Sequence, residues 1–393
     1  MKVIQVNSML RGSTGKICRG IKNLSSVETD ITNDIYYFWG EDTSEGVKCS
    51  NIVLQKFYAL KSRITGKYGF VSDINTLLLI RHLKKEKPDI IHLHNVHDHT
   101  VNLIPLFKYI SKNDVKVIWT FHDCWAFTGY CSHFVISGCE KWRANCCDCP
   151  VYKEYSWFID RSNYLFEKKK DLYMSLDLTI VTPSKWLSEL VDKSFLSQSD
   201  IRVINNGIDL KVFNPRTSNF KSKYGIEDKK IVLGVAFNWN EKKGIDVFYR
   251  LDRELPDDCV IVLVGSNEMI SNISNRVILI PRTNNQIELA EIYSAADVFV
   301  NPTREDTFPT VDMEAIACGT PVVSFNTGGT AEIVHSESGY VVDVDSFDEL
   351  VSKVLLVLED PGIYRENCLK VAKTFCQEEK FKEYSNLYLE FKK

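Results

Sequence analysis

Two carboxylates, Asp306 and Glu314, flank a loop that runs into a predicted helix in NPTREDTFPTVDMEAIACGTPVVSFNTGGTAEIV, residues 301–334. Pro309 suits the first turn of that helix. The backbone N–H groups between Phe308 and Thr310 would then face outward and could bind an anion. Glu314, about one turn inside the helix, is placed to accept hydrogen bonds from hydroxyl groups. A nucleotide-sugar requires both features, although a capped structural helix has the same pattern.

A second pattern that could bind phosphate, RGSTGKI at residues 11–17, follows the first apolar run of the chain. It does not fit the P-loop sequence G-x-x-x-x-G-K-[ST]. Leu10 stands at the first glycine position, and Ile17 stands where Ser or Thr should follow the lysine. The segment is therefore a glycine-rich turn between a strand and a helix. Gly12 and Gly15 would let its backbone approach an anion closely.

Cysteine is concentrated in one segment, because six of the twelve cysteines lie within residues 124–149. Four of these have the spacing C-x7-C-x6-C-x2-C, and the last two form a C-x-x-C pair of the kind that binds zinc. A cytoplasmic chain is not expected to rely on disulfides. Structural zinc and reduced thiols that pack a loop both remain open for these four residues: Cys131, Cys139, Cys146 and Cys149.

Four histidines occur in the run HLHNVHDH, residues 92–99. Such a run suggests a metal site, but the chain has no H-E-x-x-H sequence or comparable ligand spacing near it. We therefore do not expect a catalytic metal there.

These candidate residues lie in a pattern of short apolar runs that alternate with longer amphipathic segments. The runs, such as LTIVTP and KIVLGVAF, are nearly continuously hydrophobic, which is typical of parallel strands covered on both faces. The alternation predicts doubly wound parallel sheets. A length of 393 residues favours two domains, joined near residues 204–215, where Asn206-Gly207 supplies a turn.

Composition limits the function classes. The chain is 44% hydrophobic and 25% charged with a net charge of −4, and it has no apolar run long enough to span a membrane. No nucleic-acid partner is expected, since no recognition motif occurs. The start MKVIQVN indicates a strand rather than a signal peptide, so we expect a cytoplasmic protein. Basic clusters at 81–87 and 167–170 could rest on an anionic bilayer or could simply be solvated helix faces.

Residues 301–334 resemble the E-x7-E signature of glycosyltransferase family 4 and the EA-x-A-x-G-TPVV and GG-x-x-E-[IL]-[IV] segments that follow it. Glu314 matches the second acid, whereas the first falls on Asp306, a shorter carboxylate, with Glu305 beside it. Further segments, in family order and spacing, are TPSKWL (182–187), VINNGID (203–209) and ADVFVNPT (296–303).

The resemblance implies the GT-B architecture, in which two Rossmann-like domains face each other across a cleft that holds the active site. Residues 1–205 would form the acceptor-binding domain and residues 206–375 the nucleotide-sugar domain, with a C-terminal helix at 376–393 packing back on the first domain. The loop with Gly12 and Gly15 would close over the donor phosphates, so Gly15→Val should weaken catalysis more than folding.

The resemblance also implies roles for single residues. EKKGID (241–246) is similar to the family's phosphate-binding lysine segment, so Lys243 would place a positive charge on the donor diphosphate. The family often has an arginine six residues earlier, where this chain has Phe237. Either another cation takes its place, or backbone amides and Asn238 do.

The resemblance gives roles to five further residues. His122 in TFHDCW matches a histidine that lines the cleft near the transferred sugar. Arg282 lies near the strand end where the base should dock. Asp306 and Glu305 would orient the sugar and Glu314 the ribose.

The function implied is that of a retaining glycosyltransferase that needs no metal cofactor for catalysis. It would move a sugar from a UDP- or GDP-linked donor to a glycan or a polyprenyl-diphosphate-linked acceptor, in the synthesis of bacterial capsule, exopolysaccharide or O-antigen. It would work in the cytoplasm, with peripheral contact to the inner face of the plasma membrane. The alternatives are a GT-B epimerase or phosphorylase, and a transferase-like scaffold without catalysis.

Overall fold

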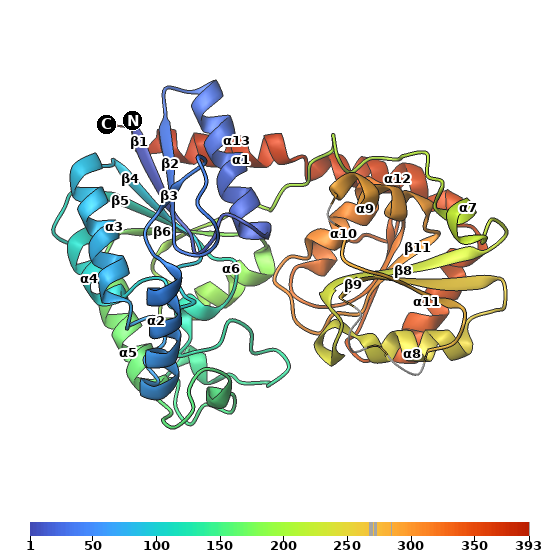
Figure 1. Ribbon diagram of the computed structural model, residues 1–393, viewed down its shortest axis with the longest axis horizontal. Helices are drawn as coiled ribbons and strands as arrows, with labels where there is room; N and C mark the ends of the chain where they lie inside the picture. Colours follow the sequence, from blue (N-terminus) through green and yellow to red (C-terminus); the bar gives the residue numbers. More distant parts are fainter. Residues whose placement is uncertain (267–269, 271–272, 284, 393) are drawn as a thin grey trace. The chain divides into compact units, whose positions relative to one another are not determined.

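The computed structural model describes residues 1–266, 270, 273–283 and 285–392, and these form two compact units (Figure 1). One unit contains Met1–Asn205 and Glu378–Lys393, and the other contains Asn206–Gln377. Each unit is built on one parallel sheet, with apolar clusters between the sheet and the helices on both of its faces. The prediction of two doubly wound α/β domains is therefore confirmed.

The first unit has a seven-stranded parallel sheet in the order β3-β2-β1-β4-β5-β6-β7. All five residues of β6, LTIVT, are buried, as expected of a strand covered on both faces. The strands are β1 (Lys2–Val6), β2 (Thr32–Tyr37), β3 (Val47–Lys48), β4 (Ile90–Leu93), β5 (Lys116–Thr120), β6 (Leu178–Thr182) and β7 (Asp200–Val203).

Helices connect and cover these strands. The Asn51 side chain accepts a hydrogen bond from the N–H of Leu54 and so caps the start of α2, and Gly66 ends α2 in the left-handed conformation. The helices are α1 (Ser13–Glu28), α2 (Ile52–Thr65), α3 (Asp73–Glu86), α4 (Leu103–Ile110), α5 (Ser162–Tyr173), α6 (Lys185–Asp192) and α13 (Gln377–Glu390), with short 3-10 turns η1 (Trp125–Phe127), η2 (Lys141–Arg143) and η3 (Tyr152–Glu154).

Helix α13 joins the first unit although it follows the second unit in the chain. Its Phe381 ring packs so closely against α1 that a Cβ on Gly20 would lie 2.0 Å from it. The Tyr388 hydroxyl lies 2.6 Å from Nδ1 of His92 in β4. The helix thus completes both the apolar core and the buried polar contacts on one face of the sheet.

The second unit has a six-stranded parallel sheet in the order β10-β9-β8-β11-β12-β13. Its strands are β8 (Lys230–Asn238), β9 (Cys259–Ser266), β10 (Val277–Ile280), β11 (Val298–Asn301), β12 (Val322–Phe325) and β13 (Gly339–Val342). Its helices are α7 (Phe220–Tyr224), α8 (Ile245–Glu254), α9 (Gln286–Ala295), α10 (Thr310–Ala317), α11 (Phe347–Glu359) and α12 (Gly362–Thr374), with the 3-10 turns η4 (Glu241–Lys243) and η5 (Thr330–Glu332). Among the helices of the described ranges, none is both long and apolar enough to cross a membrane.

Candidate functional site

Polar side chains of the first unit meet at the edge of the sheet where β1, β4 and β5 end. His94 follows β4 and His122 follows β5, and the two rings stack at 5.4 Å between centroids with 15° between their planes. Nδ1 of His94 lies 3.1 Å from Nε2 of His122. The carboxyl ends of strands are where open α/β sheets bind ligands, so this edge is the candidate site of the first unit.

A buried glutamine fixes how these two histidines hydrogen-bond. The Gln5 amide nitrogen donates to the carbonyl of Cys18 and to the side chain of Asn33, at 3.0 Å and 2.9 Å. Its oxygen therefore accepts from Nε2–H of His94 at 3.0 Å. Nδ1 of a neutral His94 is then an acceptor, so the contact with His122 requires Nε2–H of His122 to donate.

Burial keeps the histidines of this edge neutral. It lowers the pKa of His122 to about 4 and that of His92 to about 3, and it holds the pKa of His94 well below its ordinary value. At neutral pH, His122 is therefore a hydrogen-bonding group without positive charge.

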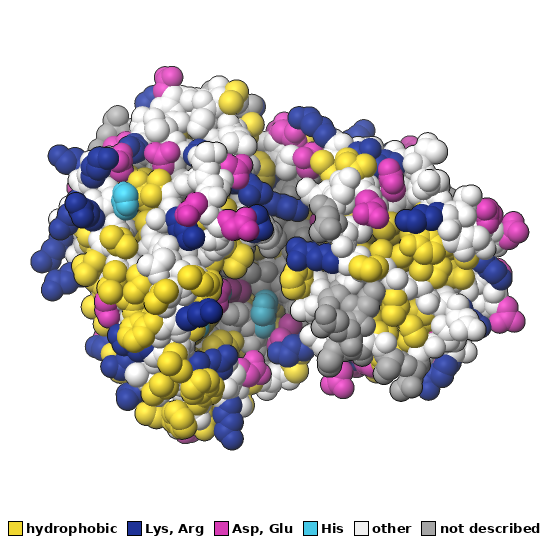
Figure 2. All heavy atoms as spheres, viewed as in Figure 1, with side chains coloured by type: hydrophobic (Ala, Val, Ile, Leu, Met, Phe, Trp, Pro, Cys, Tyr) yellow, Lys and Arg dark blue, Asp and Glu magenta, His cyan; other side chains and the backbone are white. Residues whose placement is uncertain are grey.

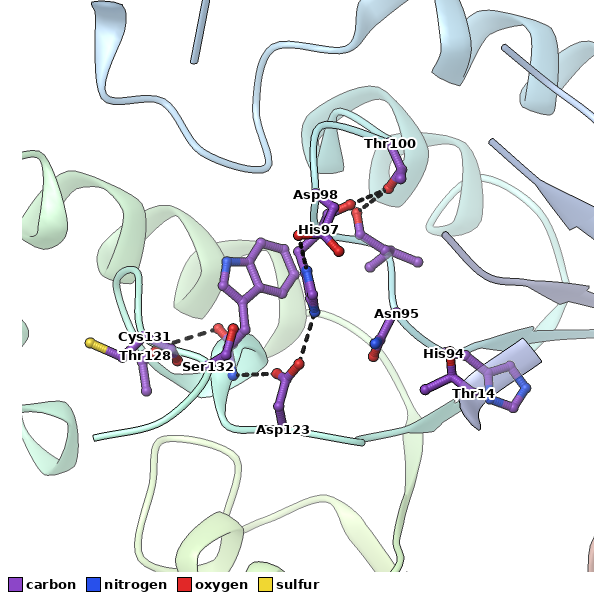
Figure 3. Close-up of polar contacts among 12 residues, drawn as sticks. Thr14, His94, Asn95, His97, Asp98, Thr100, Asp123, Thr128, Cys131 and Ser132 are labelled. Carbon is purple, nitrogen blue, oxygen red and sulfur yellow. Dashed lines mark hydrogen bonds and ion pairs between the residues drawn. The ribbon is translucent and has the colours of Figure 1, made fainter. Parts of the chain in front are cut away.

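The glycine-rich segment lies beside these histidines. Asn7, which follows β1, donates to Oγ1 of Thr14 at 3.1 Å and accepts from the N–H of Asn95 at 3.1 Å. Asn95 directly follows His94 in the chain, and Figure 3 labels Thr14, His94 and Asn95 in one close-up. The start of α1 thus reaches the same edge of the sheet as His122.

The placement of Gly15 corrects one expectation. Gly12 precedes α1 with φ +88°, whereas Gly15 lies inside the first turn of α1, not in a loop. A Cβ on Gly15 would stand 2.1 Å from the backbone oxygen of Leu10. Gly15→Val must therefore disturb the folding of this turn, and an effect mainly on catalysis is no longer expected.

A charged cluster that the sequence did not suggest stands next to His122. Nε2 of His97 lies 2.8 Å from Oδ2 of Asp123, and its Nδ1 lies 3.0 Å from Oδ1 of Asp98 (Figure 3). Burial would lower the pKa of His97, but the two carboxylates raise it to about 10. His97 is therefore a buried cation held between two anions. Asp123, the neighbour of His122 in the chain, is fixed by this contact.

The same cluster holds a strained turn. Asp98 and His99 both have positive φ, at 57° and 63°, which non-glycine residues adopt rarely. The Tyr68 hydroxyl donates to Oδ1 of Asp98 at 2.8 Å, and the Trp39 indole donates to the Asp98 carbonyl at 2.9 Å. Strain of this kind persists only where surrounding contacts impose it, and it is common at functional sites.

In the second unit, a lysine and two acids meet at the strand ends. Nζ of Lys243 lies 3.3 Å from Oδ2 of Asp306 and 3.2 Å from Oγ1 of Thr303. Glu305, although adjacent to Asp306, pairs instead with Lys242 at 3.4 Å. The structure thus brings Lys243 and Asp306 together and directs Glu305 to another partner.

Backbone contacts and one arginine hold this lysine and its acid in place. A Cβ on Gly244 would lie 2.4 Å from the Pro302 oxygen, and one on Gly328 would lie 2.2 Å from the Asp306 oxygen. Arg304 hydrogen-bonds both carboxylate oxygens of Asp246 at 2.9 Å and 2.7 Å. The glycines are therefore required by the close approach of backbone segments around the lysine and the acid.

Helix α10 places the second acid. The Tyr293 hydroxyl donates to Oε2 of Glu314 at 3.2 Å and so orients that carboxylate. The Phe308 side chain is buried in the core against Phe375, so at this position only the backbone can face a ligand. Pro309 stands directly before the helix and Thr310 is its first residue.

Asp312 is a buried acid of α10 that sequence patterns did not identify. Its Oδ1 accepts from Asn301 at 2.7 Å, while its buried Oδ2 has no hydrogen-bond partner within the described ranges. Burial raises the pKa of Asp312 well above its ordinary value. The hydrogen bond from Asn301 fixes α10 to the end of β11.

Two other predicted residues lie together at the end of β8. The Arg282 guanidinium lies 4.5 Å from the centroid of the Phe237 ring, a cation–π contact. Phe237 is 66% exposed, and Asn238, the last residue of β8, is also exposed. No contact between described residues joins this pair to Lys243 or Asp306 directly.

The four predicted cysteines line one small cavity of the first unit. Cys131 hydrogen-bonds Cys149, which lowers the pKa of Cys149 and raises that of Cys131. The N–H of Gly129 donates to Sγ of Cys146 at 3.2 Å. Across the residues that the structure describes, no three His, Cys, Asp or Glu side chains are already arranged as metal ligands, and this includes the histidine run.

Two protein-family models match the chain. The model described as "Glycosyltransferase Family 4" matches residues 59–212, and the one described as "Glycosyl transferases group 1" matches residues 216–375. The boundary between the matches falls close to the boundary between the two units.

Curated relatives agree with these matches. The chain is 24% identical over 274 residues to the putative colanic acid biosynthesis glycosyl transferase WcaC of Escherichia coli, covering 67% of this chain and 66% of that protein. It is 22% identical over 297 residues to the sulfoquinovosyl transferase SQD2 of Arabidopsis thaliana, covering 72% of this chain and 52% of that protein. The matches thus span about half to two thirds of the relatives' length.

Solved structures share the fold. Sucrose-phosphate synthase from Thermosynechococcus elongatus superposes with a TM-score of 0.75 at 17% identity, covering 99% of both chains. Anabaena Alr3699/HepE in complex with UDP-glucose superposes with a TM-score of 0.66 at 13% identity, also covering 99% of both chains.

The His97 cluster predicts how stability depends on pH. The folded chain keeps a proton on His97 up to about pH 10, whereas the unfolded chain releases it near 6.5. The stability from this proton is fully present below pH 6.5 and is lost as the pH rises toward 10. We expect His97→Gln to remove a decline of about 4 kcal/mol across this window.

Chemical denaturation at a series of pH values between 6.5 and 10 measures this slope. His335→Gln is the control, because His335 is exposed in the second unit. Parallel stability curves for His97→Gln and the unchanged protein would show that His97 is not held as a buried cation.

Proposed function

Because this chain belongs to glycosyltransferase family 4 and has the GT-B fold, we propose that it transfers a sugar from a UDP- or GDP-linked donor to a hydroxyl group of a glycan or lipid-linked oligosaccharide. The observation that carries the proposal is the contact of Lys243 with Asp306 at the strand ends of the second unit, followed by Glu314 on α10. HepE, a protein of the same fold, has been solved with UDP-glucose bound.

Each group has a task that fits its surroundings. The Lys243 ammonium binds the donor diphosphate and counters the charge that grows on it as the glycosidic bond breaks. Asp306, beside that lysine, orients the sugar hydroxyls, while Glu305 is engaged by Lys242. Glu314, oriented by Tyr293, accepts hydrogen bonds from the ribose.

We assign a retaining course to the reaction. The bond between the sugar C1 and the diphosphate oxygen breaks, and the acceptor oxygen forms its bond to C1 on the same face. The acceptor proton passes to the departing phosphate, and the nucleoside diphosphate leaves. His122 is neutral, so it supports this step by hydrogen bonding to the sugar rather than by charge.

Arg282 takes the place of the cation that family members often carry at the position of Phe237. Its guanidinium lies over the Phe237 ring at 4.5 Å, so the positive charge is held above the residue that replaced the arginine. The exposed Phe237 ring holds the guanidinium in position by the cation–π contact. With Asn238 next to it, this pair adds donors for the nucleotide.

Zinc is the ligand that we assign to the four cysteines. The donor set suits tetrahedral zinc, and the N–H groups of Gly129 and Val151 donate to the sulfurs of Cys146 and Cys149, as they would to metal-bound thiolates. Lys169 lies buried beside the cavity, and burial lowers the pKa of its amine. Its three hydrogen bonds to carbonyls use all three protons of an ammonium, which would offset part of the negative charge of a zinc site with four thiolates. The thiols must still turn inward, since they are not yet arranged as ligands.

The acceptor is proposed from the relatives. WcaC is named for colanic acid biosynthesis, and WaaG, a solved structure of the same fold, for lipopolysaccharide biosynthesis. We therefore place this chain in bacterial surface polysaccharide synthesis, acting in the cytoplasm on an acceptor that is carried at the membrane.

A screen of UDP- and GDP-sugars tests the activity. The matching donor should raise the midpoint of thermal unfolding, and with acceptor present it should release nucleoside diphosphate. Glu314→Gln should lower transfer about 100-fold with the fold retained. Glu359→Gln, at the exposed end of α11, is the control. Epimerised donor without acceptor would indicate an epimerase instead, and no donor binding at all would indicate a scaffold.

The Phe237–Arg282 contact predicts that an arginine at position 237 can replace the one at position 282. Arg282→Ala should weaken donor binding about tenfold, since a charge-assisted contact is lost. Adding Phe237→Arg to that variant should restore binding, measured by calorimetry. Arg253→Ala, an exposed change on α8, should have no effect. If Arg282→Ala binds the donor normally, the guanidinium has no part in the site.

Metal analysis tests the cysteine cluster. The purified protein should contain zinc in equal amount to the chain, and Cys146→Ser with Cys149→Ser should abolish it. Cys147→Ser should keep the zinc, because Cys147 is outside the assigned ligand set. A zinc-free wild-type protein that folds normally would overturn the assignment.

A further inference from the structure

Large apolar side chains are exposed on the outer side of α2. Val53, Phe57, Leu60 and Ile64 follow one another at helical spacing, so they form a single stripe along the helix. Val53 is 72% exposed and Phe57 is 55% exposed. The residues by which α2 packs on its own unit are different ones, Gln55, Tyr58 and Ser62.

Two neighbouring segments extend this stripe into a surface. Exposed side chains of α3 and of the segment after η3 lie beside α2. The Trp157 N–H donates to the Arg63 carbonyl at 2.8 Å, and the Ile74 N–H donates to the Tyr58 hydroxyl at 3.0 Å. We call the whole the α2 surface, and its apolar members are Ile52, Val53, Phe57, Leu60, Ile64, Ile74, Leu77, Leu78, Trp157, Phe158 and Ile159. Figure 2 shows hydrophobic side chains gathered on this side, at the lower left of the view.

The charges along α2 and in the segments that flank it in the sequence are mainly positive. No acidic residue occurs between Glu45 and Asp73 in the sequence. Asp73 itself pairs with Lys61 at 3.3 Å. The basic residues of this segment are Lys48, Lys56, Lys61, Arg63 and Lys67. Figure 2 shows Lys and Arg side chains beside the hydrophobic ones.

We infer that the α2 surface binds an anionic lipid bilayer. Apolar side chains on one side of a helix with lysine and arginine at its flanks are the combination that inserts at the boundary between head groups and acyl chains. A second copy of this chain would bring the same positive charges together, so the charge favours an anionic partner. An apolar surface of this extent is rare on monomers without a binding role.

The inference deepens the proposed function, since it rests on an acceptor that is carried at a membrane. The basic clusters at 81–87 and 167–170 are not the core of this surface. The apolar residues of α2 and of 157–159 supply the insertion, and the basic residues between Glu45 and Asp73 supply the attraction.

Sedimentation of the full chain with vesicles tests the inference without any sugar transfer. We expect strong binding to vesicles with equal amounts of phosphatidylcholine and phosphatidylglycerol, and weak binding to phosphatidylcholine alone. Phe57→Ser with Leu60→Ser should lower the partition coefficient by about tenfold or more, because two exposed apolar groups no longer insert. Val27→Ser on α1 is the matched control, because Val27 is 84% exposed outside the α2 surface.

Three outcomes would overturn the inference. Wild-type protein could fail to bind the anionic vesicles. It could bind them equally well after the double change on α2, which would mean that charge elsewhere is responsible. Light scattering could instead show a dimer that the double change dissociates, with no vesicle binding, which would make the surface a contact between copies. Loss of donor binding in the same preparations would concern only the proposed transfer activity.

Discussion

A parallel sheet that is covered on both faces leaves its polar side chains no access to water, so each must find a partner within the protein. Gln5 in β1 and His92 in β4 are such residues. Gln5 ties His94 to the sheet, and His94 contacts His122 at the strand ends. His92 meets the Tyr388 hydroxyl from α13. The hydrogen-bonding state of the candidate site is therefore set by residues buried beneath it.

The same requirement explains why some histidines at this edge are neutral and another is protonated. His94 and His122 lie in a neutral chain of hydrogen bonds, and burial removes their protons. His97, only a few residues away, is equally buried but stands between two carboxylates, and it keeps its proton. One short segment thus provides an uncharged hydrogen-bonding face and a fixed ion cluster. In the second unit, two adjacent lysines likewise pair with two adjacent acids, Lys242 with Glu305 and Lys243 with Asp306.

Much of the fold was predictable because strand patterns are local. Runs such as LTIVT, which are mostly apolar and rich in β-branched residues, are typical of buried parallel strands, and in the structure this run is such a strand. The resemblance identified Lys243 and the acids Glu305 and Asp306. It did not show that Glu305 pairs with Lys242 and Asp306 with Lys243, because this pairing depends on the directions of the side chains. Likewise, His97 and Asp123 are 26 residues apart, and Phe237 and Arg282 come from different strand ends. No periodicity connects such pairs, because only the sheet order brings them together.

The placement of α13 has a consequence for how the chain reaches its folded state. The first unit includes residues Glu378–Lys393, which follow the whole second unit in the sequence. The ribosome must therefore synthesise the second unit before the core of the first unit can be completed. During synthesis, His92 lacks its partner Tyr388, and the surface around Gly20 lacks Phe381. Both residues are made after all strands of both sheets. The unit that begins first is thus completed last. Until α13 has been made, the apolar residues that it covers on the first sheet stay exposed, and transiently exposed apolar surface of this kind favours aggregation.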